Sequence, residues 1–407
     1  AINVHDTATL VTDGVENLTL VSSGAANSVT ALNAVDVQVL TINGDQNLTL
    51  GTITGGTVGQ FTTVNGSAAT GNLTLSIDNV LNTAMRGTSG TGAPVNFNLS
   101  TGTGADVLNV TAVGQVIGNA ADTIDTGDGN DTVNFRAAVT NVFTDATSAV
   151  FNNVEAVTVT RTDDALFVAS NLTLDLERLA GDQTIRLTNS GDAGDGAATF
   201  TLNNLSAVEA GQITVAHSTT GNNDLLQNIV VANLEDGSGA SDTVALTIAD
   251  GVNAEPRFNV QLTAGGTTAA SRVENVTLND NDTESNSVRL NNFAQHTGTI
   301  SVTGGVAGQF MNLDAAAAGN GYGFDTTGVT TGDAVVTDTA VSSVFNTTAV
   351  PVANLAVASS IDSSTFAGDL IVRVGEADQN IQFGAGNDTV IFADQTGISS
   401  ATSGLTI

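Results

Sequence analysis

Several residue types are missing from this chain, and each absence removes a class of chemistry. The 407 residues contain no cysteine, which excludes disulfide bonds, thiol catalysis and cysteine-ligated zinc. Lysine is also absent, so nine arginines are the only basic side chains besides three histidines. No apolar run reaches the length of a membrane-spanning helix, and we therefore expect a chain that is not membrane-spanning.

Large side chains are scarce as well. Tryptophan is absent, Tyr322 is the single tyrosine, and aromatic residues make up 4 % of the chain. Hydrophobic residues nevertheless reach 41 %, so the core must be built from Val, Leu, Ile, Ala and a few Phe. Small branched side chains suit thin, stacked β layers better than a wide globular core. With three prolines and 44 glycines, the composition indicates many turns.

The charge is strongly one-sided. The formal net charge is −32, and 32 of the 41 acidic residues are Asp, the short carboxylate that is common in turns and calcium loops. Such a chain repels phosphate backbones, which argues against nucleic acid as a partner. Because the chain also repels itself, divalent cations would help it to fold.

Most of the chain alternates polar and apolar residues, as half-buried β strands do. The clearest examples share an Asn-Leu-Thr-Leu pattern and begin at Asn17, Asn47, Asn72 and Asn171. Long amphipathic helices are missing, and the best short helical candidate, residues 174–179, fits a strand equally well. The chain begins within one strand-like pattern and ends with another, with no signal peptide in front, so we expect a segment of a longer protein.

Three kinds of segment recur in the same order along the chain. The first is a strand opening with Val and an acid, at Val15-Glu16, Val154-Glu155 and Val273-Glu274. The second is a Gly-polar turn that leads into a strand, and the third is a Gly-x-Gly-x-Asp turn. Ordered recurrence predicts stacked units, in an all-β, repetitive parallel β-solenoid or β-roll. We expect three repeat domains, at 1–140, 141–252 and 253–407. The competing interpretation is that a Thr- and Val-rich chain produces such similarities by chance.

The Gly-x-Gly-x-Asp turn is the motif with the most specific chemistry. Complete copies followed by an apolar strand run over 102–108, 127–133 and 384–390, and weaker ones end at Asp325 and Asp242. The copies at Gly127 and Gly384 each have a related segment nine residues upstream, at Gly118 and Gly375.

This pattern indicates calcium. The ion takes about six to eight oxygen ligands, and paired glycines allow the positive φ that turns main-chain carbonyls inward. The Asp supplies charge, and a second turn nine residues away is expected to complete the shell around the ion. An ordinary polar turn is the alternative for each copy.

These turns, together with the acidic cysteine-free composition and the Val-Glu-Asn-Val-Thr-Leu strand at residues 273–278, resemble the RTX-type S-layer proteins of Gram-negative bacteria. The resemblance implies a calcium-dependent structural protein, secreted by a type I system, that forms a two-dimensional lattice of its own copies at the cell surface. It also implies attachment to cell-surface polysaccharide through a region not present in this sequence. The calcium ligands that it implies are Gly102, Thr103, Gly104, Asp106, Gly118, Ala120, Asp122, Gly127, Asp128, Gly129, Asp131, Gly375, Ala377, Gly384, Gly386, Asp388 and Asp325.

Two other functions remain open. An RTX adhesin or extracellular matrix protein would share the calcium turns and the export route. An enzyme is not expected, because His5, His217 and His296 lie in unrelated contexts and no HExxH motif is present. A polysaccharide-modifying enzyme on a β-solenoid could still use a carboxylate pair, but few aromatic residues are available to line its cleft.

Overall fold

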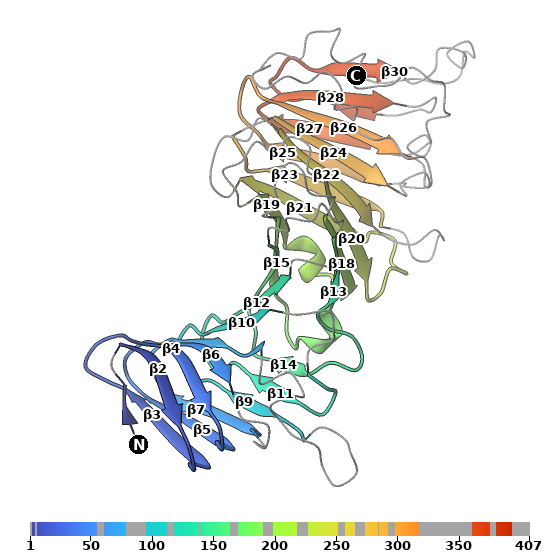
Figure 1. Ribbon diagram of the computed structural model, residues 1–407. Helices are drawn as coiled ribbons and strands as arrows, with labels where there is room; N and C mark the ends of the chain where they lie inside the picture. Colours follow the sequence, from blue (N-terminus) through green and yellow to red (C-terminus); the bar gives the residue numbers. More distant parts are fainter. Residues whose placement is uncertain are drawn as a thin grey trace. The chain divides into compact units, whose positions relative to one another are not determined.

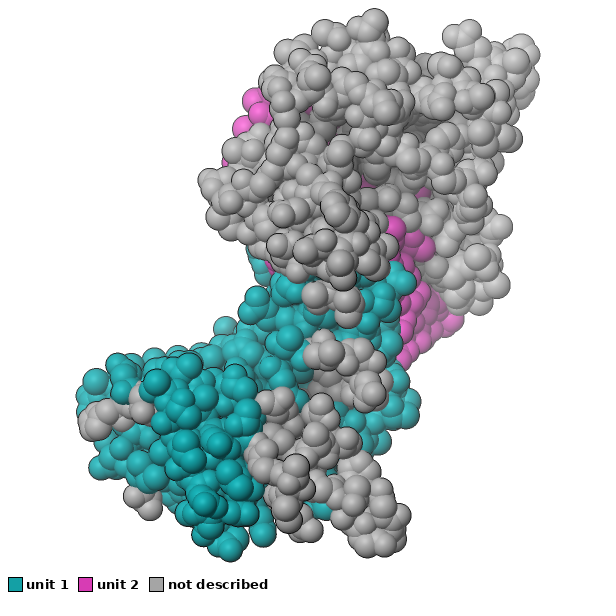
Figure 2. All heavy atoms as spheres, in the orientation of Figure 1, with its two compact units in different colours: residues 1–162, 170–187 teal, residues 163–169, 188–407 magenta. Residues whose placement is uncertain are grey.

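The computed structural model describes residues 2–4, 6–54, 61–78, 95–111, 118–137, 140–162, 170–189, 198–217, 227–250, 257–264, 273–283, 285–291, 298–316, 360–374 and 380–392. Within these ranges the chain forms 30 β strands and two short 3-10 helices (Figure 1). It divides into two compact units, residues 1–162 with 170–187 and residues 163–169 with 188–407 (Figure 2). In the described part of the chain, no helix is long and apolar enough to cross a membrane.

Unit 1 is built from parallel strands that alternate between two sheets. The strands of its first sheet are, in spatial order, β1 (Ile2–Asn3), β3 (Asn17–Ser22), β5 (Val39–Gly44), β7 (Thr63–Ala69), β9 (Asn98–Ser100), β11 (Thr123–Asp125) and β14 (Val150–Asn152). Those of its second sheet are β2 (Thr7–Thr12), β4 (Asn27–Ala34), β6 (Leu48–Thr54), β8 (Leu73–Ser76), β10 (Val107–Thr111), β12 (Thr132–Ala137), β15 (Ala156–Arg161) and β17 (Thr184–Asn189). Two further strands, β13 (Asn141–Val142) and β16 (Ser170–Asp175), pair in a third sheet.

The strand register places apolar residues next to apolar residues of the neighbouring strand, and polar residues next to polar ones. Leu18 of β3 pairs with Leu40 of β5, and Leu40 pairs with Val64 of β7. All three side chains are buried, with 4 % exposure or less. Because side chains alternate across a strand, the neighbouring threonines Thr19 and Thr41 form an outward row. Each turn of the chain through both sheets, called a rung below, therefore adds one layer to a continuous apolar core.

The core widens where the third sheet joins. After β12 the chain forms β13 and then β14 before it returns to the second sheet at β15. Phe135 of β12, Phe143 and Phe151 of β14 are fully buried there, and the Phe135 ring centroid lies 5.1 Å from that of Phe143 and 5.8 Å from that of Phe151. A three-sided cross-section encloses more space than two facing sheets, and large aromatic side chains fill it. Helix η1 (Leu176–Arg178) falls within the segment for which helix and strand were both expected.

Unit 2 continues the same construction with a different pairing of sheets. One sheet contains, in order, β18 (Ala198–Leu205), β20 (Gln227–Leu234), β22 (Arg257–Ala264), β24 (Ser285–Asn291), β26 (Phe310–Ala316), β28 (Asp369–Val374) and β30 (Thr389–Phe392). The other contains β19 (Ile213–His217), β21 (Thr243–Asp250), β23 (Asn275–Asp280), β25 (Thr299–Gly304), β27 (Ser360–Phe366) and β29 (Asn380–Gln382). Helix η2 (Glu209–Gly211) lies between β18 and β19. The predicted all-β architecture with parallel, solenoid-like sheets is confirmed.

The aromatic cluster gives a test of this core. We expect Phe135→Ala to lower the free energy of unfolding of unit 1 by about 3–5 kcal/mol, because it removes the ring that two others contact and leaves a cavity. Urea denaturation followed by circular dichroism measures this change. Val11→Ala is the control, since Val11 is 61 % exposed, and it should change the free energy by less than about 0.5 kcal/mol. Equal effects of the two substitutions would contradict the proposed role of the cluster.

Candidate metal-binding turns

Two of the Gly-x-Gly-x-Asp turns stack directly on each other. The turn at 102–106 leads into β10 and the turn at 127–131 leads into β12, and the register pairs Val107 with Thr132. The amide of Asp128 donates to the carbonyl of Gly102 at 3.0 Å. The two turns are one complete rung apart, so like positions superpose.

The predicted partner of the Gly127 turn was the segment nine residues upstream, and this prediction is wrong. Asp122 of that segment precedes β11, a strand of the other sheet. Its carboxylate accepts hydrogen bonds from the amides of Phe97 at 2.8 Å and Asn119 at 2.9 Å. A solenoid chain passes along both sheets before it returns to the same place, so turns that stack are separated by a whole rung.

Glycine is required at the stacked positions. Gly127 has a φ of +81°, and a Cβ added there would lie 2.1 Å from the carbonyl oxygen of Gly102. A Cβ on Gly129 would lie 2.1 Å from the carbonyl oxygen of Gly104. The carbonyls of one turn therefore lie directly against the main chain of the next.

Three acidic side chains connect successive rungs beside these turns. Asp106 Oδ1 accepts a hydrogen bond from the amide of Leu73 at 2.7 Å. Asp131 Oδ1 accepts from the amide of Asp106 at 2.6 Å, and Glu155 Oε2 accepts from the amide of Asp131 at 2.7 Å. Each acid thus reaches back to the rung before it, and the three carboxylates form a column along the strand starts of β8, β10, β12 and β15.

One oxygen of this column has no partner. Asp106 and Asp131 are fully buried, and Asp131 Oδ2 is a buried atom without a hydrogen bond. Burial, together with the like charges of Asp106 and Glu155, raises the pKa of Asp131 to about 6. Burial also raises the pKa of Asp106. Unpaired buried carboxylate oxygens are costly, so this position favours a bound cation or proton.

The donor set fits calcium. The stacked turns combine carboxylates with crowded main-chain carbonyls, the hard oxygen ligands that calcium accepts in irregular numbers and angles. Within the described ranges, no three His, Cys, Asp or Glu side chains converge as a metal-binding group. Main-chain carbonyls of the stacked turns are available to supply part of a coordination shell.

The other predicted ligands of unit 1 divide into two groups. Thr103, Ala120 and Asp128 are exposed turn residues. Gly118, with a φ of +69°, lies against Asp122, where a Cβ would come within 2.8 Å of Oδ2. Asp122 is fully buried but both of its oxygens accept amide hydrogen bonds. In the upstream segment, the Asp122 carboxylate therefore fixes the main chain near the start of β11 through these hydrogen bonds.

The C-terminal turn repeats the stacking in unit 2. A Cβ on Gly384 would lie 2.2 Å from the carbonyl oxygen of Phe366, and one on Gly386 would lie 2.1 Å from that of Gly368. Asp388 Oδ1 accepts from the amide of Leu370 at 2.8 Å, as Asp106 does from Leu73. The predicted ligands Gly375, Ala377 and Asp325 lie outside the described residues.

Sequence reasoning missed Glu155. Its Val-Glu dipeptide was interpreted only as the opening of a strand, whereas its side chain contacts the Asp131 amide of the preceding rung. The available signal was the distance from Asp131 to Glu155, 24 residues, which nearly equals the 25 residues between the two stacked turns.

A separate pair of buried acids lies in unit 2. Asp280, at the end of β23, and Asp282 are 4 % and 6 % exposed. Asp280 Oδ1 accepts hydrogen bonds from the Asp282 amide at 3.3 Å and from Asn286 Nδ2 at 2.9 Å. Burial and the neighbouring Asp282 carboxylate raise the pKa of Asp280 to about 7.

Comparisons of this chain with protein-family models, with curated proteins and with solved structures found no match.

The crowded glycines give a stability prediction. We expect Gly127→Ala to lower the free energy of unfolding of unit 1 by well over about 1 kcal/mol, the cost of left-handed backbone alone, because the new methyl group also collides with the Gly102 carbonyl. Gly14→Ala is the matched control, since Gly14 has a φ of +66° with nothing within 4 Å of its added Cβ. Chemical denaturation measures both, and equal losses would contradict the close stacking.

Asp280 gives a pH prediction. Its folded-state pKa lies above the ordinary value, so the folded state binds the proton more tightly and loses stability as pH rises from about 4 to about 7. Asp280→Asn keeps the acceptor oxygen and removes the charge, and should flatten the fall in melting temperature between about pH 5 and pH 8 in chelator. Asp362→Asn is the control, because hydrogen bonds from Ser364 lower the pKa of Asp362. Identical pH profiles for wild type and Asp280→Asn would refute the assignment.

Proposed function

We propose that this protein is a secreted structural protein whose parallel β-solenoid is stabilised by calcium and assembles into a two-dimensional layer on the bacterial cell surface. The observation that carries the proposal is the pair of stacked Gly/Asp turns, with the buried, unpartnered oxygen of Asp131 beside them. The carbonyls of those turns and the carboxylates of Asp106 and Asp131 would hold the ion. Calcium there supplies positive charge that offsets the repulsion between neighbouring rungs.

Charge supports the same function. A chain with a formal net charge of −32 and no lysine gains little from ion pairs within itself. Divalent cations bound between rungs reduce that self-repulsion, and they are abundant outside the cell. Folding would then be coupled to export, since the turns fill with metal only after the chain has left the cytoplasm.

Assembly follows from the regularity of the fold. One row of short polar side chains, Thr243, Asn275, Thr299 and Ser360, runs across the outward face of one sheet in unit 2. Repeating surfaces of this kind suit contacts between copies of the same chain. The resemblance to RTX-type S-layer proteins adds the cell-surface location and anchoring to polysaccharide through another region.

Calcium dependence is the first test. Removal of calcium with a chelator should lower the melting temperature and reduce the β-type circular dichroism signal, and calcium added back to about 10⁻³ M should restore both. Magnesium at equal concentration is the control, because it prefers six regular ligands and keeps its waters. Spectra and melting curves that do not respond to chelation would overturn the calcium part of the proposal.

Assembly is tested separately by electron microscopy of the calcium-loaded protein. Ordered sheets support a surface layer, whereas isolated rods would favour an adhesin and overturn the layer assignment.

A further inference from the structure

We infer that a Gly/Asp turn followed one rung later by a Val-Glu dipeptide forms a composite cation site, and that the described residues contain two, Asp131–Glu155 in unit 1 and Asp242–Glu274 in unit 2. The inference rests on the proposed calcium dependence and adds the ligand that closes each site. It assigns a role to the Val-Glu segments, which stacking of Gly/Asp turns alone does not explain.

In unit 1 the two acids are joined by reciprocal hydrogen bonds. The amide of Asp131 donates to Glu155 Oε2 at 2.7 Å. The carbonyl of Asp131 in turn accepts from the amides of Glu155 at 3.2 Å and Ala156 at 2.9 Å. This places the Glu155 carboxylate beside the Asp131 main chain, where no further Gly/Asp turn follows.

Unit 2 repeats the arrangement with different spacing. The amide of Asp242 donates to Glu274 Oε2 at 3.0 Å. The carbonyl of Asp242 accepts from the amides of Glu274 at 3.0 Å and Asn275 at 2.8 Å. The acids are 32 residues apart here and 24 in unit 1, so the shared geometry arises from the rung and not from a fixed sequence interval.

Both pairs leave the same atom without a partner. Asp131 Oδ2 and Asp242 Oδ2 are buried and accept no hydrogen bond. Asp131 is fully buried and Glu274 is 9 % exposed, whereas their partners Glu155 and Asp242 are half-buried. If the Glu side chain served only to hold the Asp main chain, one uncharged acceptor for the Asp amide would be enough. A Glu carboxylate at the Asp main chain, together with an unpartnered oxygen on the Asp itself, instead offers oxygen ligands for a divalent cation, and the turn carbonyls would supply the remaining ones.

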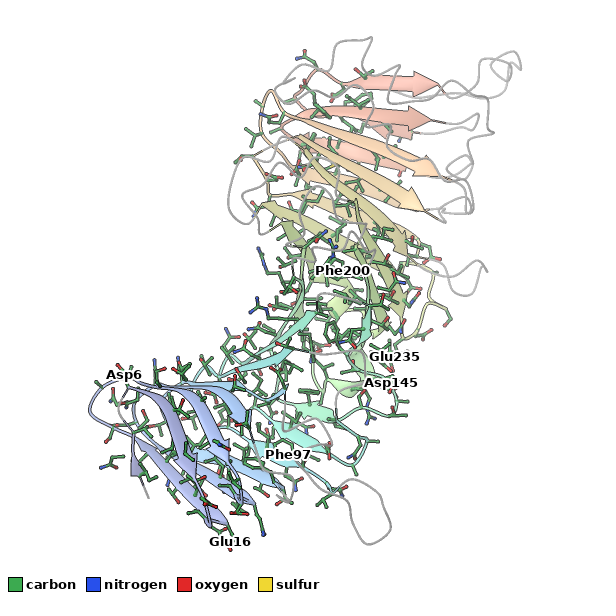
Figure 3. The ribbon with its side chains drawn as sticks, in the orientation of Figure 1. Asp6, Glu16, Phe97, Asp145, Phe200 and Glu235 are labelled. Atoms are coloured by element: carbon green, nitrogen blue, oxygen red, sulfur yellow. The ribbon has the colours of Figure 1, made fainter. Side chains whose placement is uncertain are left out.

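The chain contains its own negative control. Val15-Glu16 is the same dipeptide at the start of β3. The Glu16 carbonyl accepts from the amides of Gln38 at 2.8 Å and Val39 at 3.0 Å in the next rung, as the Glu155 carbonyl accepts from the amide of Thr184 at 2.9 Å. The Glu16 side chain is exposed (Figure 3). Glu16 therefore shares the dipeptide and the carbonyl acceptor role of Glu155, but its side chain is exposed.

The experiment compares Glu155→Gln, Glu274→Gln and Glu16→Gln with wild type by calorimetric titration with calcium. Glutamine keeps an acceptor oxygen for the Asp amide and removes the charge, so a bracing role survives the change. We expect Glu155→Gln and Glu274→Gln each to lose one bound calcium, or to weaken one site by at least about tenfold. The double variant should lose both, and Glu16→Gln should bind as wild type does.

The outcomes separate this inference from the proposed function. If wild type binds no calcium, the proposed function fails and this inference fails with it. If wild type binds calcium but Glu155→Gln and Glu274→Gln match Glu16→Gln in number and affinity of sites, only the composite sites are refuted. Circular dichroism in calcium checks that each variant folds. Because each pair lies within its own unit, either variant alone is sufficient to decide.

Discussion

The parallel hydrogen-bond ladder between rungs is the constraint on which the rest of this structure depends. Pairing of Val107 with Thr132, for example, brings two Gly/Asp turns into register. Superposition then crowds carbonyls against glycines and places acid above acid. The same ladder that builds the core therefore places acidic side chains one above another along the strand starts. A chain with this fold must either avoid acids at those positions or neutralise them.

The acids are retained, and they have two different roles. Asp122 uses both oxygens to hold amides of its surroundings and needs nothing else to be satisfied. Asp131 uses one oxygen in this way and keeps the other unpaired in a buried position. The difference lies in the strand that each residue precedes and in the neighbours that the rung supplies, since both occur in similar sequence motifs. The neighbouring rung therefore decides the role of such a carboxylate. Where it supplies amide donors to both oxygens, the carboxylate only holds the main chain, and where it leaves one oxygen unpaired, the carboxylate is a candidate metal ligand.

Much of the fold could be predicted from the sequence, because alternation of Val, Leu and Thr reports directly on strands that are half buried. Leu18, Leu48 and Leu73, each in an Asn-Leu-Thr-Leu segment, were recognisable as inward residues from that pattern, and all three are buried. The pairing of turns could not be predicted from the nonapeptide interval, since the rung length is set by the whole path through both sheets. The role of Glu155 was hidden for the same reason: its partner Asp131 is 24 residues away, and only the register brings them together. The third sheet after β12 was also missed, although Phe135, Phe143 and Phe151 mark it by their size.

Register in these sheets is independent of how much chain separates the paired strands. Thr132 and Ala156 pair across 24 residues, and Thr299 and Ser360 pair across 61 within the same kind of sheet. The entropy of closing a connection grows only slowly with its length, so a long excursion between rungs adds little cost once the strands have paired. The number of residues in a rung and the distance between successive strands along the solenoid axis are consequently independent of each other in this architecture. New sequence can enter at the corners of a rung during evolution, or by design, while the spacing of the strands above and below stays the same.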